Sequence, residues 1–466
     1  MNLRSAPGCV PQRQRLGDAL PAGVLPPGTV DWCVERLARA ATLLSASPAA
    51  GSGPHWVLDR ELVACHLVAP WVIAAANGLA PPPRPRPPVA APGGGWVDVD
   101  PGPDDHDTWD RLWAVVAQEA AETGAAPDAE LLARRAQEWR LPVTPYRTAA
   151  LHPMSAPANS PTVAHRRSHT PPSPAGLHDA AGLHHAAGLH HASGLHDPGG
   201  RPVAPLAGVV VVDLTVLWAG PLATWLLAGL GARVIKVEPA VRPDGLRRGD
   251  RPASAGPGDG ALFVALDHGK EHVQLDLRRP ADYARFLELV STAHVVIDNL
   301  SRRVRPNLSI EPERLRRVQP RLIDLSLRAF NPLGPQADWV AHGGGVHAAS
   351  GMARCRPDGV PQPALVSYPD PVAGFAAFEI LVTALRALPD GEAPASMVLS
   401  LEHALRSLHA GVASLDPLAQ RIDIESPSRA GLWQWAMAAA ERASVMADGC
   451  RTLPSPLRFG AARSNP

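Results

Sequence analysis

The clearest run of apolar positions lies at Pro205–Glu238, PLAGVVVVDLTVLWAGPLATWLLAGLGARVIKVE. The β-branched run Val209–Val212 predicts a buried strand, and an apolar helical segment follows it. After Gly231, the segment Arg233–Val237 predicts a second buried strand. Strand, helix and strand with short joints indicate a βαβ unit of a parallel sheet. Ligands of such sheets bind at the carboxyl ends of the strands, so the turn at 215–221 is the first candidate site.

That turn reads TVLWAGPLAT and contains a single glycine, Gly220. A dinucleotide-binding turn has the motif G-x-G-x-x-G, whose bare backbone approaches a pyrophosphate at a helix N-terminus. Glu238 imitates the acid that binds a ribose in such proteins, but the glycines of the motif are absent. On the pattern alone, a ligand-binding βαβ unit and a purely structural one both stay open.

The alternation of strands and amphipathic helices continues beyond this unit, which indicates a doubly wound parallel sheet. The elements predicted there are a strand ending in the LDL of 275–277, a helix at 280–290, a strand at 293–300, a helix at 313–318 and a strand at 321–327. The elements predicted before it are a helix at 29–44, one or two buried helices within 62–80, a strand at 96–99, a Trp-bearing helix after that strand, and a helix at 129–139.

Composition divides the chain into five segments. The 466 residues include 52 prolines and 40 glycines, which indicates long connections between globular parts. The predicted segments are a disordered tail at 1–28, a smaller α+β domain at 29–150, a Pro- and His-rich linker at 151–202, a large domain at 203–412 and a C-terminal tail at 413–466.

Charge and cysteine usage narrow the classes of partner. Acidic and basic residues number 44 each, so no net field favours nucleic acid or an anionic membrane. The five cysteines are scattered, with no C-x-x-C pair, which argues against a disulfide framework or a zinc site. We therefore predict a soluble cytoplasmic protein without a metal.

Two stretches have both a metal-binding and a simpler interpretation. The acidic group 104–107 fits the solvated start of a helix better than a set of ligands, since adjacent side chains on one turn point apart. The repeat AGLHDA-AGLHHA-AGLHHA-SGLHDP at 175–198 offers imidazoles to a transition metal. Its regular glycines favour a flexible spacer instead.

Together with the βαβ stretch, later motifs resemble the family III CoA-transferases. The family pattern is roughly PL-x-G-x-x-V-L-D-x-(T/S)…AGP-x-(A/C)-(T/S)…LGA-x-VIK-(V/I)-E, and 205–238 follow it in order and spacing. HGKEHVQLDL at 268–277 is similar to the family's N-R-G-K-R-S-(V/I)-x-L-D-L, and SLRAFNPLGP at 326–335 to its SxxGFGxxGP. Residues 96–147 resemble the family's small domain, which usually follows the first motif rather than preceding it.

The resemblance implies a Rossmann-like large domain and an enzyme that moves coenzyme A between an acyl-CoA thioester and a free carboxylic acid. The family's catalytic aspartate stands in D-x-x-x-G before an apolar helix, a position held here by Asp370. That carboxylate would form an acyl anhydride and then an aspartyl-CoA thioester. The racemase branch has a histidine where this chain has His342, so a 2-methylacyl-CoA racemase using His342 and Asp370 is the alternative. A degenerate member that only binds or scaffolds is a third reading, because the family's C-terminal part is shortened here.

The resemblance also implies the surroundings of Asp370. The backbone of Gly343 and Gly344 would stabilise an oxyanion. Family members form interlocked homodimers, so a second copy of the chain is an expected partner. The residues expected to bind coenzyme A are Trp218, Ala219, Gly220, Lys270, Asn299 and Arg328, with Arg242, Arg247 and Arg248 as further cations.

Overall fold

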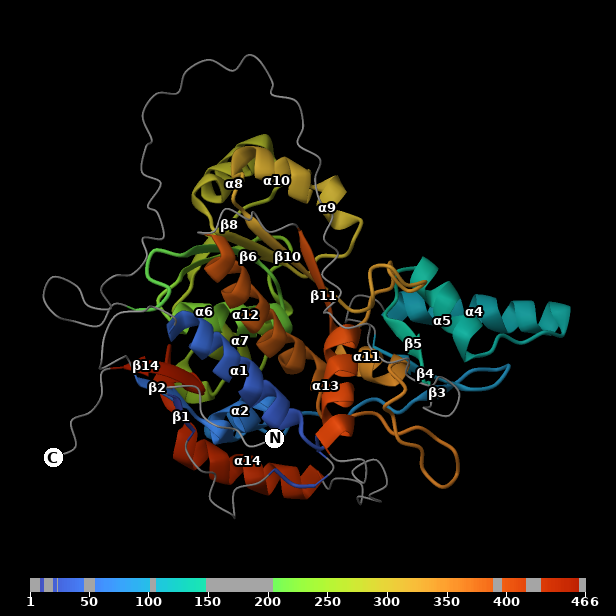
Figure 1. The fold of residues 1–466 in the computed structure, drawn as a ribbon. Coiled ribbons are helices and arrows are strands. Elements are labelled where there is room, and N and C mark those ends of the chain that lie inside the picture. Colours follow the sequence, from blue (N-terminus) through green and yellow to red (C-terminus); the bar gives the residue numbers. More distant parts are fainter. Residues whose placement is uncertain are drawn as a thin grey trace, which may run out of the picture.

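A six-stranded parallel sheet forms the centre of the molecule (Figure 1). The computed structural model describes residues 9–11, 20–22, 24–45, 55–100, 106–147, 204–388, 396–415 and 429–460. The strands of this sheet are β6 (Val210–Leu214), β7 (Arg233–Glu238), β8 (Glu271–Gln274), β9 (Val295–Asp298), β10 (Ile323–Arg328) and β11 (Met397–Ser400). Their order in space is β11-β10-β9-β6-β7-β8, and every neighbouring pair is parallel.

Helices cover both faces of the sheet because its strands are apolar on both faces. Val211 and Ile297 point into one hydrophobic core, whereas Val212 and Val296 point into the other. The second core is closed by α8 (Pro280–Thr292) and α10 (Pro312–Val318). The first core is larger and contains α6 (Ala219–Gly229), α7 (Ala261–Asp267) and α12 (Pro369–Ala387).

The direction of the strand order reverses at the middle of the sheet. From β6 the chain runs outward to β7 and β8, and then returns to the other side of β6 as β9. At such a reversal, the loops that follow the two central strands diverge and leave room for a ligand. The loops after β6 and β9 therefore form the expected binding edge.

Residues from both ends of the chain complete the larger core. Helix α1 (Thr29–Ser45) packs along α12, and α3 (Ala69–Ala76) packs on α14 (Arg429–Ala443), with α2 (Arg60–Leu67) between them. A small sheet joins β1 (Cys9–Pro11), β2 (His55–Leu58) and β14 (Leu457–Gly460), so the C-terminal segment pairs with the N-terminal one. Strands β12 (Val445–Ala447) and β13 (Cys450–Thr452) form a hairpin beside α7.

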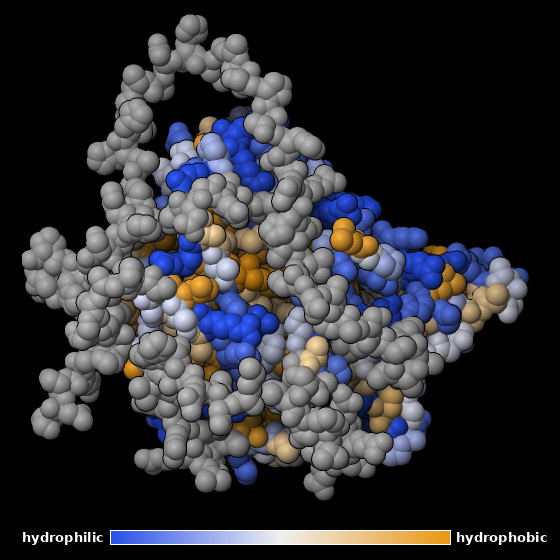
Figure 2. Space-filling view, in the orientation of Figure 1, coloured by the Kyte–Doolittle hydropathy of each residue, from blue (hydrophilic) through white to orange (hydrophobic). Residues whose placement is uncertain are grey.

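A separate lobe carries its own core. Its antiparallel sheet consists of β3 (Val89–Ala90), β4 (Trp96–Val99) and β5 (Val143–Pro145), covered by α4 (His106–Thr123) and α5 (Ala129–Glu138). Figure 1 shows α4 and α5 projecting from the main body, and in Figure 2 their visible surface is mainly hydrophilic with isolated hydrophobic patches.

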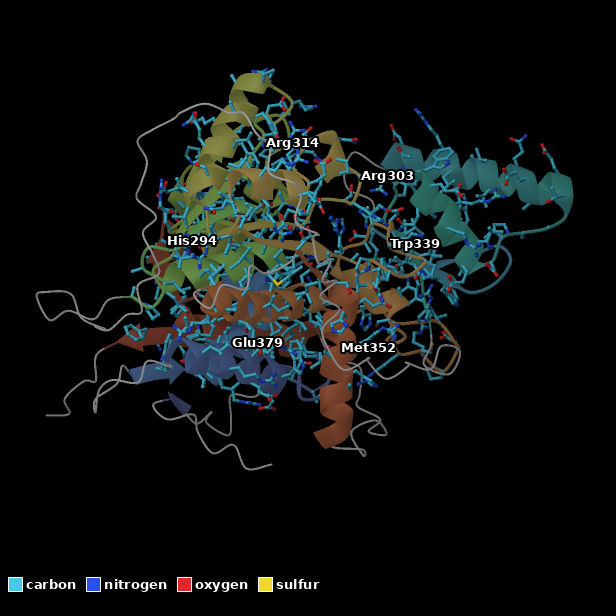
Figure 3. The ribbon with its side chains drawn as sticks, turned by 45° about the horizontal axis from the view of Figure 1, so that its top comes forward. His294, Arg303, Arg314, Trp339, Met352 and Glu379 are labelled. Atoms are coloured by element: carbon cyan, nitrogen blue, oxygen red, sulfur yellow. The ribbon has the colours of Figure 1, made fainter. Side chains whose placement is uncertain are left out.

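The lobe contacts the large domain at α11 (Gly343–Ala349) and the loop before it. Trp339 packs against both the core of the lobe and the larger core, and it lies between the two bodies in Figure 3. Gln137 of α5 accepts a hydrogen bond from the Val340 N–H at its side-chain oxygen, and its side-chain nitrogen donates to the Val340 carbonyl. These contacts fix the lobe directly beside the glycine-rich turn.

The predicted α/β class with a doubly wound parallel sheet is confirmed. The smaller α+β unit was predicted at 29–150, but only the lobe from β3 to β5 has a core of its own. Helices α1, α2 and α3 belong to the larger core instead, because their apolar faces pack on α12 and α14. One strand differs in position: β8 is Glu271–Gln274, and the LDL of 275–277 follows it. Residues 429–460, predicted only as part of a tail, fold as α14 and three short strands. The remaining helices are α9 (Val304–Asn307) and α13 (Leu401–Leu415), with 3-10 turns at Gly245–Arg248 and Ala253–Ala255.

Two predicted features fall outside the described residues. The linker at 151–202 with its histidine repeat is one, and the acids at 104–105 are the other. Across the described ranges, no helix is both long and apolar enough to cross a membrane.

Candidate functional site

Asp370 lies in the first turn of α12, where the helix begins at Pro369. Proline suits this position because its fixed φ fits a helix start and its missing N–H removes no hydrogen bond there. A carboxylate is also favoured at a helix N-terminus. The Ser367 hydroxyl donates to Asp370 Oδ2 over 2.6 Å, and the Gly343 N–H also donates to this carboxylate.

The glycine turn approaches Asp370 more closely than any other residue type could. A Cβ on Gly343 would lie 2.1 Å from Asp370 Oδ2 and 2.3 Å from Ser367 Oγ. Real Cβ atoms do not come this close to an oxygen, so the contact requires glycine. The turn 342–345 and the start of α12 therefore form one unit around the carboxylate.

Burial raises the pKa of Asp370 above the ordinary value of an aspartate. The hydrogen bonds from Ser367 and Gly343 and the nearby His342 act in the opposite direction. The result is a carboxylate that is more basic than a solvated one but is held in its charged form by directed donors. Such a group is suited to nucleophilic attack or to proton transfer.

His342 is held by a carboxylate from the lobe. Its Nδ1 lies 3.0 Å from Asp100 Oδ2, and each side chain is about 46% exposed. This hydrogen bond raises the pKa of His342 and lowers the pKa of Asp100. His342 thus reaches the site from the N-cap position of α11 with its ring orientation set by Asp100.

The period of two in β4 and β5 explains why the lobe presents polar groups to this turn. Val97 and Val99 fill the core of the lobe, so Asp98 points to the opposite face. Thr144 of β5 likewise points away from the core of the lobe, and its hydroxyl donates to the Gly345 carbonyl over 3.0 Å. The Tyr146 hydroxyl donates to Asp98 Oδ1 over 3.2 Å.

The loop after β6 is held in a strained conformation at the reversal of the strand order, where a ligand crevice is expected. Leu217 has φ 67°, which is unusual for a residue with a branched side chain. Its N–H donates to Asp244, whose two carboxylate oxygens lie 3.2 and 3.0 Å away. The Asn299 side chain, just after β9, bonds both the N–H and the carbonyl of Val216 at 3.0 and 2.8 Å. Asn299 therefore ties together the loops that follow β6 and β9.

The first residues of α6 continue from this loop. Trp218 is its N-cap and is 7% exposed, and its Nε1 has no hydrogen-bond acceptor among the described residues. Gly220 packs onto Thr215, where a Cβ would lie 2.3 Å from the threonine side chain. Ala219 contacts α12, since a Cβ on Gly374 would lie 2.8 Å from its carbonyl oxygen. The loop is thus connected to the helix that carries Asp370.

Lys270 is enclosed within the protein. Its Nζ lies 3.3 Å from Asp213 Oδ2, 3.0 Å from Asp267 Oδ1 and 3.1 Å from the Pro221 carbonyl. Lys236 joins the same network through Asp267 and a 3.0 Å contact with Asp244. In this arrangement the ammonium group of Lys270 holds the start of α6 and has no exposed surface.

Arg328 lies at the carboxyl end of β10, close to Asn299. Its Nη1 is 3.8 Å from Asp298 Oδ1, and within the described residues that nitrogen has no hydrogen-bond acceptor. Burial lowers the pKa of the Arg328 guanidinium. A desolvated guanidinium at this edge gains by contact with an anionic ligand.

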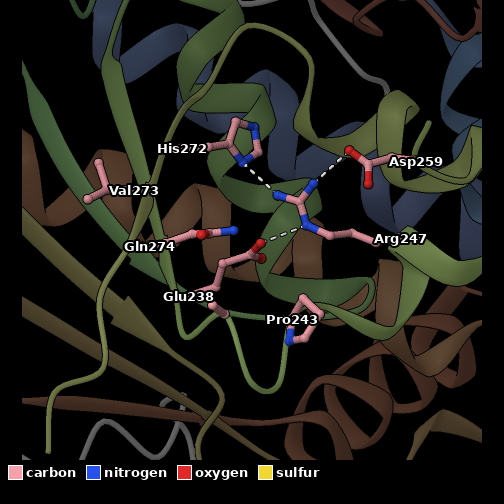
Figure 4. A pocket seen from close by; sticks show the side chains of 8 residues that line it. Glu238, Pro243, Arg247, Asp259, His272, Val273 and Gln274 are labelled. Carbon is pink, nitrogen blue, oxygen red and sulfur yellow. Dashed lines mark hydrogen bonds and ion pairs between the residues drawn. The ribbon is translucent and has the colours of Figure 1, made fainter. Parts of the chain in front are cut away.

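A cavity of about 480 Å³ opens at the ends of β7 and β8 (Figure 4). Arg247 lies at its centre and bonds Glu238 and Asp259 at 2.6 Å each and His272 at 3.0 Å. A neighbouring cavity shares Arg247 and is also lined by Lys270. Neither cavity shares a lining residue with the group around Asp370.

The predicted site residues fall into two groups. Asp370, His342, Gly343 and Gly344 form one, while the loop after β6 and its partners form the other. Sequence reasoning missed Ser367 and the three lobe residues Asp98, Asp100 and Tyr146. The acids at alternate positions of a predicted strand were a usable signal, because they had to share one face. Across the described ranges, no cluster of three or more His, Cys, Asp or Glu side chains is arranged to hold a metal.

Known proteins match the large domain. Residues 206–425 match the sequence model of CoA-transferase family III. The acetyl-CoA:oxalate CoA-transferase of Acetobacter aceti is 39% identical over 166 residues, which cover 34% of this chain and 41% of that protein. The succinate–glutarate CoA-transferase of Agrobacterium fabrum is 35% identical over 201 residues, covering 40% of this chain and 49% of that protein. The chain thus spans less than half of either relative.

Solved structures include a crystal structure of a CAIB/BAIF family protein from Brucella suis. It is 27% identical, with a TM-score of 0.42, and the match covers 48% of this chain and 60% of that one.

Proposed function

Residues 206–425 belong to CoA-transferase family III, and from that premise we propose that this protein exchanges coenzyme A between an acyl-CoA thioester and a free carboxylic acid. The observation that carries the proposal is the setting of Asp370. Its carboxylate accepts hydrogen bonds from Ser367 and from the backbone of Gly343. It lies on α12, which packs against the start of α6 at Gly374.

Asp370 is the nucleophile in this proposal. One carboxylate oxygen attacks the thioester carbon, the C–S bond breaks, and an acyl–aspartyl anhydride and a CoA thiolate form. The thiolate then attacks the aspartyl carbonyl, which releases the first acid and leaves an aspartyl-CoA thioester. The acceptor acid reverses these two steps. Covalent catalysis of this kind divides one difficult exchange into easier ones.

Each step passes through a tetrahedral oxyanion, and the turn at 343–344 supplies backbone N–H groups beside the reacting carbon. The Gly343 N–H bonds the carboxylate in the resting state. Gly344 follows it at the start of α11. Because Gly343 has no side chain, its backbone lies directly against the carboxylate that would meet the thioester.

Coenzyme A would enter along the crevice edge. Trp218, Ala219 and Gly220 line its β6 side, and Asn299 and Arg328 lie on its β9 and β10 side. The buried donors of Trp218 and Arg328 would gain acceptors from the bound thioester. Lys270 contributes by fixing the start of α6 through Asp213 and the Pro221 carbonyl.

Asp370→Ala tests the proposal. We expect the exchange of CoA between an acyl-CoA and a free acid to fall at least ~10³-fold, since the nucleophile is removed. Asp358→Asn, an exposed change in the loop between α11 and α12, is the matched control and should keep full activity. Hydroxylamine added during turnover should mark the Asp370 peptide in a mass spectrum. Exchange at the unaltered rate in Asp370→Ala would refute the assignment.

A 2-methylacyl-CoA racemase is the second candidate, and the hydrogen bond between His342 and Asp100 favours it. That bond holds the His342 imidazole next to the turn that contacts Asp370. One of these two side chains would remove the α-proton of a bound thioester, and the other would return a proton to the opposite face. A racemase would incorporate deuterium from D₂O at the α-carbon and yield no hydroxylamine adduct. A protein that does neither would be a binding or scaffold member of the family.

We also propose a cytoplasmic homodimer. Cys33, Cys65, Cys355 and Cys450 are unpaired, which suits a reducing compartment. Light scattering coupled to size-exclusion chromatography tests the assembly, with a mass of about 98 kDa expected from two chains of 49.1 kDa.

A further inference from the structure

The lobe before the family III region brings two carboxylates to the site. Asp98 lies in β4, and Asp100 directly follows that strand with its N–H still bonded to the Pro142 carbonyl, so the two side chains share the face that meets the glycine turn. Asp100 is half-exposed and bonds His342. Asp98 lies behind it, 9% exposed, and a Cβ on Gly344 would lie 3.9 Å from its Oδ2.

Asp98 has an unusual environment for a buried acid. Tyr146 donates to its Oδ1, whereas its Oδ2 has no hydrogen-bond partner within the described residues. Its electrostatic neighbours are Asp100, His342 and Arg86, and burial together with Asp100 raises its pKa to about 6. Buried carboxyl oxygens are rarely left unpaired without a functional reason.

Acidic side chains dominate the charge around the glycine turn. Asp98 and Asp100 stand on one side of the turn and Asp370 on the other, and all three interact with His342. The positive groups that reach the acids of the lobe are His342 and the exposed Arg86. As the pH rises above the pKa of His342, the imidazole loses its charge while the carboxylates keep theirs.

We propose that Asp98 and Asp100 form a specificity wall that selects acyl groups and acceptor acids without a second negative charge. This inference rests on the proposed CoA-transferase function. A monocarboxylic acid presents one charge to Asp370 and an uncharged tail to the wall. A dicarboxylic acid of equal length brings its second carboxylate against Asp98 and Asp100, where the low local dielectric strengthens the repulsion.

The test is a competition between butyrate and succinate as acceptors from one acyl-CoA donor. We compare the ratio of kcat/KM for succinate to kcat/KM for butyrate, because a general loss of catalytic power cancels in this ratio. The ratio should rise about threefold in Asp98→Asn and in Asp100→Asn, and about tenfold in the double variant. Asp110→Asn, an exposed change on α4 of the same lobe, should leave it unaltered.

The dependence of the ratio on pH separates charge from a structural effect. In the wild type the ratio should rise as the pH falls through about 6, because Asp98 then takes up a proton, whereas His342, whose pKa is raised above its ordinary value, is already charged. Succinate also takes up its second proton in weak acid, but it does so equally with every variant, so the difference between the wild type and Asp98→Asn reports the charge of Asp98. In Asp98→Asn this rise should be smaller. Asp100→Asn alters a half-exposed side chain, so it tests the inference even if Asp98→Asn does not fold.

The outcomes distinguish this inference from the function on which it rests. Exchange with an unchanged succinate-to-butyrate ratio in both single variants would overturn the specificity wall and leave the CoA-transferase proposal intact. A wild type that prefers succinate would overturn it as well. A wild type that exchanges CoA with neither acid, nor with any other acceptor, would overturn both proposals.

Discussion

At the residue scale, the site depends on the close approach of the Gly343 backbone to Asp370. Gly343→Ala would place a methyl group 2.1 Å from Asp370 Oδ2 and 2.3 Å from Ser367 Oγ. The turn and the carboxylate must then separate, and a displacement of about 1 Å at a reacting centre costs ~10²-fold in rate. We expect kcat to fall by about that factor, as measured by CoA exchange.

The neighbouring glycine supplies a matched control for this prediction. In Gly344→Ala, the nearest atom to the new methyl group is Asp98 Oδ2 at 3.9 Å, an ordinary van der Waals distance. Activity should fall less than about threefold there, because the added methyl group meets no clash. Equal losses in the two variants would show that the approach of Gly343 to Asp370 has no special role.

The hydroxyl of Ser367 makes the second residue-scale prediction. Its hydrogen bond stabilises the ionised form of Asp370 and so lowers the pKa of that carboxyl, against the upward effect of burial. Ser367→Ala therefore raises the pKa of Asp370. Because the nucleophile must be ionised, the acidic limb of the pH–rate profile should move to higher pH, by about one unit at most.

The profile of kcat against pH, measured from pH 4 to 8, checks this shift. Ser350→Ala removes a hydroxyl that bonds the His347 carbonyl in the same region, and it should leave the acidic limb in place. A shift to lower pH in Ser367→Ala would contradict the proposed orientation of the hydrogen bond.

At the element scale, the loop after β6 is shaped by groups from elsewhere in the chain. Leu217 keeps φ 67° only because its surroundings impose it, and Asn299 contributes two hydrogen bonds to the adjacent Val216. Asn299→Ala removes both bonds. We expect KM for the acyl-CoA to rise about tenfold with a smaller change in kcat, since the loop lines the crevice away from Asp370.

Asn331→Ala is the control for this element. Its side-chain oxygen accepts from the exposed Leu333 N–H in another loop, so KM for the acyl-CoA should not change. If Asn299→Ala and Asn331→Ala behave alike, the loop after β6 does not contribute to acyl-CoA binding.

Sequence patterns predict a strand well where both of its faces are buried, because nearly all of its residues must then be apolar. Val210–Leu214 and Arg233–Glu238 are apolar runs in the centre of the sheet, and their positions agree with prediction within a residue or two. The edge strand β8 was placed too far along the chain, because its exposed residues read Glu-His-Val-Gln. Burial does not constrain an edge strand in the same way.

The candidate site was predictable only in part. His342, the glycine turn and Asp370 were grouped by the resemblance to family III, not by any local pattern of the chain. Asp100 precedes His342 by 242 residues, and nothing in the local pattern states that β4 meets α11. That meeting depends on the packing of Trp339 and Gln137 between two cores, which is a property of tertiary structure.

At the scale of the whole molecule, the chain on either side of the linker forms one body. The larger core contains residues from α1, α2 and α3 as well as from α6, α12 and α14. Strand β2 pairs with β14, and Arg36 of α1 forms an ion pair with Glu379 of α12, which lies on the side of that helix facing α1 (Figure 3). A shared core of this kind holds its parts together without a covalent connection, because apolar burial does not depend on chain continuity.

This arrangement predicts that cleavage between the two parts is tolerated. A protease recognition sequence inserted between residues 148 and 203 would allow the folded full-length protein to be cut into two fragments. The fragments should elute together in size-exclusion chromatography and keep CoA exchange within about twofold of the uncut chain carrying the same insertion, since loop-closure entropy adds little to an assembled core. The lobe supplies Asp100 to His342 through contacts that the cut leaves intact. Separation of the fragments under native conditions would mean that the interface between the two parts is too weak to hold the active site without the linker.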